Sequence, residues 1–200
     1  KGPVNRVVFS RDGQILVAVA GEPGLFGEVQ VWNVSNWKLL RSFRAHTDCI
    51  YAAALTSDGR LLATGSYDRT IKLWDVATGK ELKTLTGHND AVYDLDFHPN
   101  NKILASASGD RTVKLWSVET GKRLDTFSQP LKEQYAVAFS PNGKQIVAAG
   151  VDNRIRVWQL GKNATEGTNR LVVARFAHEG PVLDLEFSSD GRMLASSSED

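Results

Sequence analysis

Short segments in which apolar and polar residues alternate follow one another along the whole chain. Four of them, at 92–97, 103–108, 112–116 and 123–127, lie within one stretch and are separated by turn-forming residues. Alternation with a period of two places successive side chains on opposite faces of a strand, whereas a helix needs a period near 3.6. The pattern therefore predicts an all-β fold of short antiparallel strands.

The segments recur at a fixed spacing. Four tryptophans follow one another at intervals of 42 residues: Trp32, Trp74, Trp116 and Trp158. The strings that end at Trp74 and Trp116 are nearly identical, Asp-Arg-Thr-Ile-Lys-Leu-Trp and Asp-Arg-Thr-Val-Lys-Leu-Trp. A lone four-stranded sheet cannot bury both faces, so we expect the repeated sheets to stack against one another.

A Gly-His pair opens one repeat at Gly87-His88, and a Trp-Asp pair closes another at Trp74-Asp75. With four strands per repeat, the chain resembles the WD-repeat (WD40) family. The resemblance implies an all-β propeller of four-stranded antiparallel blades, with four full blades and strands a and b of a fifth. The expected blades of this single, partial propeller are 1–45, 46–87, 88–129, 130–177 and 178–200. We expect a piece of a longer propeller, or a ring closed by self-association.

Composition narrows the functional classes. Apolar residues make up 42% of the chain, charged residues 24%, and the net charge is +1. Neither a basic nucleic-acid surface nor a membrane-spanning apolar run is present in this sequence, so we expect no nucleic-acid and no membrane partner. The single cysteine, Cys49, excludes an internal disulfide. The compartment stays open, with the cytoplasm as the default expectation and the periplasm as the alternative.

His, Ser, Asp and Trp recur at matching places and could be mistaken for a catalytic triad. The resemblance instead implies buried hydrogen-bonded tetrads, which we assign to His46, Ser66, Asp68 and Trp74, and to His88, Ser108, Asp110 and Trp116. Thr64 and Ser106 lie on the same strand faces and are alternative hydroxyls. A catalytic site occurs once per protein, whereas this set recurs, so we expect no enzyme, no cofactor and no metal.

The fourth repeat departs from the pattern. Pro130 and Gly150 take the His and Ser places, while Asp152 and Trp158 remain. Its tetrad cannot form, so we expect Asp152→Ala to cost less stability than Asp68→Ala. The polar insertion 161–169 predicts a flexible loop between strands c and d.

In WD-repeat proteins the face formed by the d–a and b–c loops is the commonest docking surface. The position five residues after the His place points there and is occupied by Asn5, Tyr51, Tyr93, Tyr135 and Leu183. We predict that aromatic residues on this face bind a partner: Tyr51, Tyr67, Tyr93, Tyr135 and Phe26. The alternative is that the tyrosines only pack around the rim.

The predicted function is a non-catalytic scaffold that recognises protein partners of unknown identity. One alternative is the propeller domain of a larger bacterial enzyme with c-type cytochrome domains, although this chain has no Cys-x-x-Cys-His motif. A third hypothesis is a hydrolase that uses a Ser-His-Asp set.

Overall fold

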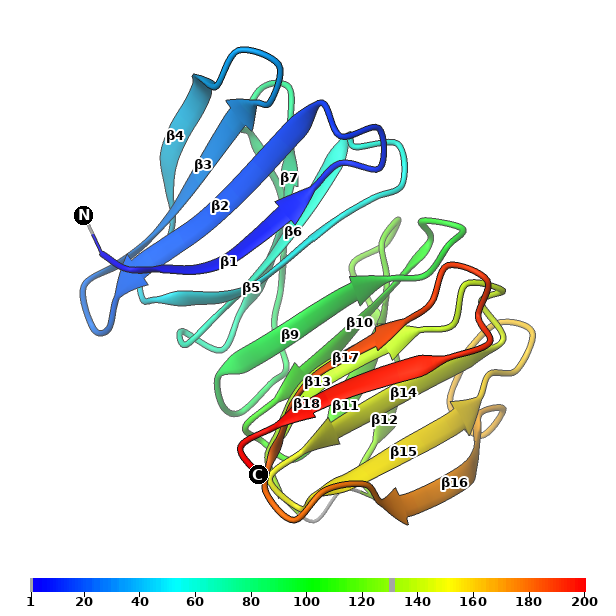
Figure 1. Ribbon diagram of the computed structural model, residues 1–200. Coiled ribbons are helices and arrows are strands. Elements are labelled where there is room, and N and C mark those ends of the chain that lie inside the picture. The colour runs from blue at the N-terminus through cyan, green and yellow to red at the C-terminus, as the bar shows by residue number, and fades with distance from the viewer. Residues whose placement is uncertain (1, 130–131) are drawn as a thin grey trace. The chain divides into compact units, whose positions relative to one another are not determined.

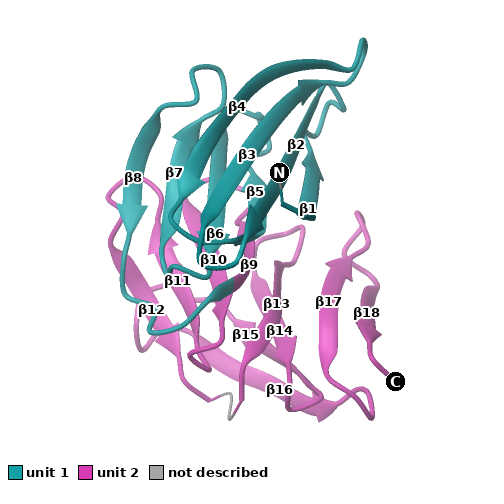
Figure 2. Cartoon of the chain, turned by 90° about the vertical axis from the view of Figure 1, so that its left-hand side faces the viewer, with its two compact units in different colours: residues 1–92 teal, residues 93–200 magenta. Residues whose placement is uncertain are grey.

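The structure, a computed structural model, describes residues 2–129 and 132–200. All regular secondary structure in this part of the chain is β-strand (Figure 1). The chain divides into two compact units, residues 1–92 and 93–200, which Figure 2 colours separately. Each unit is described by itself below.

Unit 1 contains two four-stranded antiparallel sheets. The first has the order β1-β2-β3-β4 and the second β5-β6-β7-β8, so neighbours in sequence are neighbours in the sheet. The strands are β1 Val4–Phe9, β2 Ile15–Glu22, β3 Phe26–Asn33, β4 Lys38–His46, β5 Ile50–Leu55, β6 Leu61–Ser66, β7 Ile71–Asp75 and β8 Glu81–Leu85.

Unit 2 continues the same design, with the unit boundary inside β9. Two more four-stranded sheets, β9 to β12 and β13 to β16, are followed by the pair β17-β18. The strands are β9 Val92–Phe97, β10 Ile103–Ser108, β11 Val113–Ser117, β12 Arg123–Phe127, β13 Gln134–Phe139, β14 Gln145–Gly150, β15 Arg154–Gln159, β16 Arg170–Phe176, β17 Val182–Phe187 and β18 Leu194–Ser198.

The turns between the first two strands of each sheet explain where those strands end. In the first, Ser10 Oγ donates to Asp12 Oδ1 at 2.6 Å, and Gly13 has a φ of 69°. Asn101 takes the place of that glycine in the third sheet, with a φ of 59°. Glycine and asparagine tolerate this left-handed conformation better than most residues, so the sequence encodes a tight reversal at each of these points.

The apolar core of each unit lies where neighbouring sheets pack face to face. In unit 1, Val17, Val31 and Ile50 are at most 2% exposed and share one cluster with Trp74. In unit 2, Leu115 and Trp158 belong to the corresponding cluster between the third and fourth sheets. The predicted four four-stranded sheets and one strand pair are thereby confirmed.

Neither a membrane-spanning helix nor a cluster of metal ligands is found among the described residues. No helix among them is long and apolar enough to cross a membrane. Within the same ranges, no three His, Cys, Asp or Glu side chains are grouped so that they could hold a metal ion.

Candidate functional site

In four repeats, the residue five positions after the place of the tetrad histidine lies at a β-bulge at the start of the first strand of the sheet. The strand register shifts across Asn5, Tyr51, Tyr135 and Leu183, so that each of them has no partner in the ladder. A bulge releases one residue from the alternation of the strand and redirects its side chain. These side chains are therefore presented at the strand ends where the b–c turns lie.

In unit 1, the bulge residue Tyr51 belongs to an aromatic pair. Its ring lies edge-on to Tyr67, with ring centroids 6.3 Å apart, and Tyr67 is 49% exposed. The buried Cys49 lies beside them, and Asn5 Nδ2 donates both to Cys49 Sγ at 3.0 Å and to the Ile50 carbonyl at 2.8 Å. Burial raises the pKa of Tyr51.

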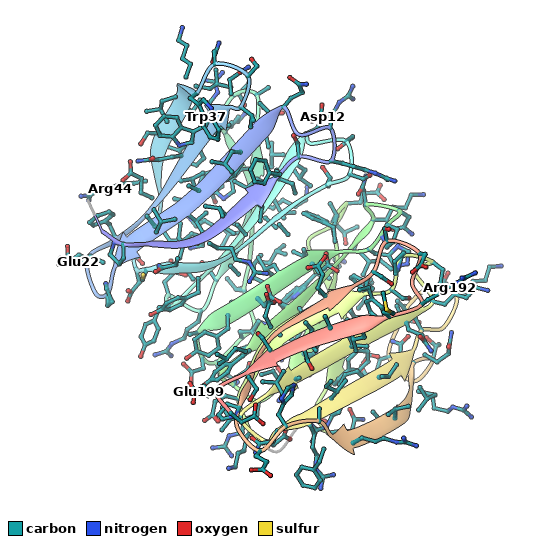
Figure 3. All side chains as sticks on the ribbon, viewed as in Figure 1. Asp12, Glu22, Trp37, Arg44, Arg192 and Glu199 are labelled. Carbon is teal, nitrogen blue, oxygen red and sulfur yellow. The ribbon has the colours of Figure 1, made fainter. Side chains whose placement is uncertain are left out.

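Unit 2 contains a second aromatic pair of the same kind. The rings of Tyr93 and Tyr135 are 5.1 Å apart and nearly perpendicular. Burial, followed by the charges of Glu133 and Glu199, raises the pKa of Tyr135. Glu199, labelled in Figure 3, lies directly after β18. An aromatic pair with acidic neighbours is suited to a partner that offers apolar surface and hydrogen-bond acceptors or cations.

Phe26 has different surroundings from the tyrosines. Its ring lies under the guanidinium of Arg44, 5.0 Å from the ring centroid, on the side of the sheet where β4 runs. Leu25, in the adjoining turn, is 63% exposed. The structure thus brings Tyr51 and Tyr67 together, whereas it places Phe26 in a contact with Arg44.

A buried hydrogen-bond network underlies the surface in unit 1. Trp74 Nε1 donates to Thr64 Oγ1 at 2.8 Å, and that hydroxyl lies 2.8 Å from His46 Nε2. His46 Nδ1 lies 2.9 Å from Asp68 Oδ2. One neutral tautomer satisfies every member: the Thr64 hydroxyl donates to Nε2, and Nδ1–H donates to the carboxylate. The network joins β4 of the first sheet to the second sheet.

The electrostatics of Asp68 follow from this network. Burial acts to raise its pKa, but hydrogen bonds from His46 and Thr70 lower the pKa well below its usual range. The carboxylate therefore stays ionised and fixes the tautomer of the imidazole.

The structure corrects the hydroxyl that the sequence assigned to this network. Ser66 is not a member: its Oγ donates to the Cys49 carbonyl at 2.8 Å and accepts the Asp68 N–H at 3.1 Å, which closes the b–c turn. The third sheet repeats the arrangement, because Trp116 Nε1 donates to Ser106 Oγ at 2.9 Å while Ser108 caps the Asp110 N–H. Thr64 and Ser106 replace Ser66 and Ser108, because they lie within reach of the indole on the neighbouring strand.

The remaining members predicted for the tetrad of the third sheet, His88 and Asp110, belong to different units. Asp110 accepts hydrogen bonds from the Thr112 amide and hydroxyl, as Asp68 does from Thr70. His88 belongs to unit 1, and its membership of a tetrad stays a prediction. A further set is present at the end of the chain, where His178 lies 2.8 Å from Ser196 Oγ and 3.0 Å from Asp200 Oδ1.

The fourth sheet lacks the network and contains a substitute for it. Ala148 stands where Thr64 and Ser106 stand, and Trp158 Nε1 has no hydrogen-bond partner in residues 2–129 and 132–200. Pro130, at the His place, lies outside the described residues. Asp152 is instead held by Arg156, with Nη1 to Oδ1 at 3.0 Å and Nη2 to Oδ2 at 2.5 Å. The prediction that Asp152→Ala costs less stability than Asp68→Ala took no account of this ion pair, which gives Asp152 a buried partner of its own.

The Thr64-His46-Asp68 set is poorly suited to nucleophilic catalysis. The hydroxyl of Thr64 is completely buried and already accepts the indole N–H, so no substrate carbonyl can reach it. The same geometry recurs around His178. The arrangement is a structural connection between neighbouring sheets.

Sequence reasoning missed a pair of carboxylates on β9. Asp94 Oδ2 accepts the Val137 N–H at 2.9 Å, and Asp96 Oδ2 accepts the Phe139 N–H at 2.7 Å. β13 is an edge strand of its sheet, and its outward amides would otherwise be unpaired. The signal was the Asp-Leu-Asp triplet within an otherwise apolar strand.

The carboxyl of Asp96 makes the stability of unit 2 depend on pH. Burial raises its pKa to about 7, helped by the charges of Asp94 and Glu186 and opposed by the hydrogen bond from Phe139. The folded state therefore holds this proton more tightly than the unfolded state, and stability should fall as pH rises from about 4 to about 7. We expect Asp96→Asn to stabilise the protein by on the order of 1–3 kcal/mol at pH 8, and little at pH 4.

Denaturant unfolding at both pH values tests this expectation. Asp190→Asn is the matched control, because a hydrogen bond from Ser188 lowers the pKa of that exposed carboxyl. Loss of the Asp190 carboxylate should reduce stability, and it should reduce stability more at pH 8 than at pH 4. A wild-type stability that does not decrease between pH 4 and pH 8, with no gain from Asp96→Asn, would contradict the assignment.

Comparison with known proteins supports the same fold. A family model described as the IFT122 first beta-propeller matches residues 3–200. The chain is 36% identical over 70 residues to a guanine nucleotide-binding protein subunit beta of Schizosaccharomyces pombe, covering 35% of the chain and 21% of that protein. It is 32% identical over 68 residues to the human intraflagellar transport protein 122 homolog, covering 34% of the chain and 5% of that protein.

Each of these relatives is similar to about a third of the chain. The chain spans about a fifth or less of the length of the two. The alternative of a bacterial cytochrome-containing enzyme stays a prediction. Because the family model matches nearly the whole chain, the protein belongs to the family of IFT122 first β-propellers, with the WD-repeat fold.

Proposed function

We propose that the chain binds protein partners through the end of its sheets where the b–c turns and bulge residues lie. The observation that carries this proposal is the pairing of all four tyrosines of the chain at that end, Tyr51 with Tyr67 and Tyr93 with Tyr135. Tyrosine combines a rigid apolar ring with a polar tip and is enriched at protein interfaces.

The rigidity of the surrounding structure supports the same proposal. The Thr64 network and the hydrogen bonds of Asn5 fix the backbone beneath the unit 1 pair. Side chains held in this way lose little conformational entropy on binding, which favours affinity. By likeness to the human relative, we propose that the partner is another subunit of an intraflagellar transport assembly.

The test compares partners recovered with the wild type and with paired tyrosine variants. We expect Tyr51→Ala with Tyr67→Ala, and separately Tyr93→Ala with Tyr135→Ala, to lower recovery of a shared partner at least about tenfold. The exposed Tyr67 contributes little to the core, so Tyr67→Ala alone should leave the melting temperature nearly unchanged.

Trp37 provides the matched control. It is 63% exposed, lies between β3 and β4 at the opposite end of the sheet, and has a φ of 54°, which asparagine tolerates. Trp37→Asn should leave recovery unchanged. A loss with Trp37→Asn, or full recovery with both tyrosine pairs removed, would refute the proposed face.

A further inference from the structure

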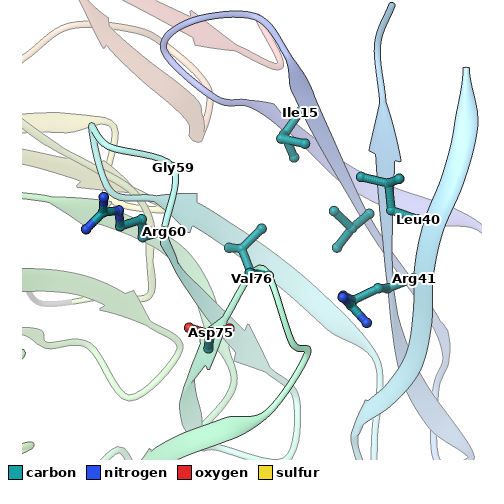
Figure 4. A pocket seen from close by; sticks show the side chains of 9 residues that line it. Ile15, Leu40, Arg41, Gly59, Arg60, Asp75 and Val76 are labelled. Carbon is teal, nitrogen blue, oxygen red and sulfur yellow. The ribbon is translucent and has the colours of Figure 1, made fainter. Parts of the chain in front are cut away.

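An open apolar pocket of about 460 Å³ lies between the two sheets of unit 1. Ile15, Val31 and Leu40 line it from the first sheet. Figure 4 shows Val76 of the second sheet across from Ile15 and Leu40. The rim is formed by the polar ends of the a–b and c–d turns of the second sheet. Leu40 is 44% exposed, so a large apolar side chain is left open to solvent here.

Unit 2 contains the equivalent groove, between its third and fourth sheets. The strand registers define the correspondence: Trp32 pairs with Leu39 as Trp116 pairs with Arg123, so Leu40 corresponds to Leu124. By the same registers the other lining residues correspond in pairs: Ile15 with Ile103, Val31 with Leu115, Val76 with Leu160 and Arg41 with Asp125.

The groove in unit 2 is filled by the chain itself. Ala164, from the insertion 161–169, is 2% exposed and packs in one cluster with Ile103, Leu124 and Leu160. Glu166 N donates to the Leu124 carbonyl at 3.0 Å, and Asn169 Nδ2 donates to Asp125 Oδ2 at 2.6 Å. The loop that the sequence predicted to be flexible is therefore held by a small apolar side chain and two polar contacts.

Unit 1 lacks such a loop. The c–d turn of the second sheet is short and closes on itself, with Gly79 N donating to the Asp75 carbonyl at 2.8 Å. Leu40 is therefore exposed, and so is Arg41, whereas Asp125 in the filled groove is only 6% exposed. The two places have corresponding apolar lining residues, and they differ in occupancy.

They also differ in the sign of one charge. Where the filled groove has the acceptor Asp125, the open groove has the donor Arg41, and Arg60 adds a second guanidinium to the rim. Asp75 supplies one opposing charge, but its Oδ1 already accepts the Thr78 amide and hydroxyl. Arg41 already interacts with the charge of Asp75, but with Arg60 the guanidinium groups outnumber the carboxylates, so a carboxylate at the place where Asn169 carries its amide would complement the groove.

We propose that the groove between the first two sheets binds a looped acidic segment of a partner protein. A small apolar residue of that segment fills the pocket as Ala164 does in unit 2, and an Asp or Glu side chain pairs with Arg41. Asn169 shows that the geometry is feasible, because its Oδ1 accepts the Gly161 N–H while its other atom faces the groove. An aspartate at this place would lose the hydrogen bond that Asn169 Nδ2 donates to the Thr165 carbonyl at 3.3 Å, but it can keep the contact with Gly161 and present its second oxygen to Arg41.

The probes are two cyclic peptides with the sequence of residues 161–169, one unchanged and one with Asn169→Asp. Binding to the 200-residue chain is followed by calorimetry and by methyl NMR signals of Leu40 and Val76. We expect the Asn169→Asp peptide to bind about tenfold more tightly than the unchanged peptide and to shift those methyl signals. In Arg41→Asp protein, the preference should reverse.

Arg69→Asp is the control variant, because it makes the same charge change on an exposed residue of the b–c turn, at the other end of the sheet. It should leave both affinities unchanged. Tighter binding of the unchanged peptide would indicate the 161–169 loop of a second copy as occupant and would overturn the proposal. Equal affinities, shifts outside the groove, or no binding would overturn it as well.

Discussion

Replacing Asp152 by alanine is expected to destabilise the protein by about 3–5 kcal/mol, measured by denaturant unfolding. The guanidinium of Arg156 is paired bidentately with this carboxylate, and Arg156 is only 4% exposed. Removing the partner leaves a buried cation without compensation, which costs far more than the pair contributes when it is intact.

The double variant Asp152→Ala with Arg156→Leu is the informative control. It removes both charges and leaves an apolar side chain in the same space, so it should recover most of the loss. If the double variant is as unstable as the single one, or if Asp152→Ala costs less than 1 kcal/mol, the ion pair does not stabilise the fourth sheet as described.

Thr64→Val should cost about 2–5 kcal/mol, since it keeps the shape of the side chain but removes two hydrogen bonds at once. The Trp74 N–H and the His46 Nε2 both lose their partner in a region that water does not reach. Each buried polar group left unsatisfied carries its own desolvation penalty.

Ser66→Ala provides the comparison within the same strand. It removes the hydrogen bond to the Cys49 carbonyl and the cap on the Asp68 amide, and should cost about 1 kcal/mol. Urea titrations of the two variants decide between the hydroxyls. A larger loss with Ser66→Ala would restore the assignment made from the sequence.

The sequence predicted the strands well because the turn residues and the period of two act locally. Its prediction of the tetrad failed at one member for a physical reason. Thr64 and Ser66 lie on the same face of β6, and only the register with β7, in which Leu62 pairs with Trp74, places Thr64 beside the indole. Alternation gives the face of a strand but not the position along it.

Sequence reasoning did not anticipate two other features, both in the fourth sheet. Arg156 aligns with Lys72 and Lys114 in the repeat, so its charge gave no sign of a compensating ion pair. The insertion 161–169 consists of polar residues and glycines except for Ala164, and nothing in its composition shows that this methyl group is buried. The ion pair joins residues four apart in sequence, whereas Ala164 is buried by contacts with segments distant in sequence.

The bulges at Asn5, Tyr51, Tyr135 and Leu183 have a consequence for how such a protein evolves. Since these residues take no part in the backbone ladder, mutation can exchange an amide for a phenol or an aliphatic chain without shifting strand register. Partner preference can thus diverge one repeat at a time, while selection for folding acts on a separate set of positions.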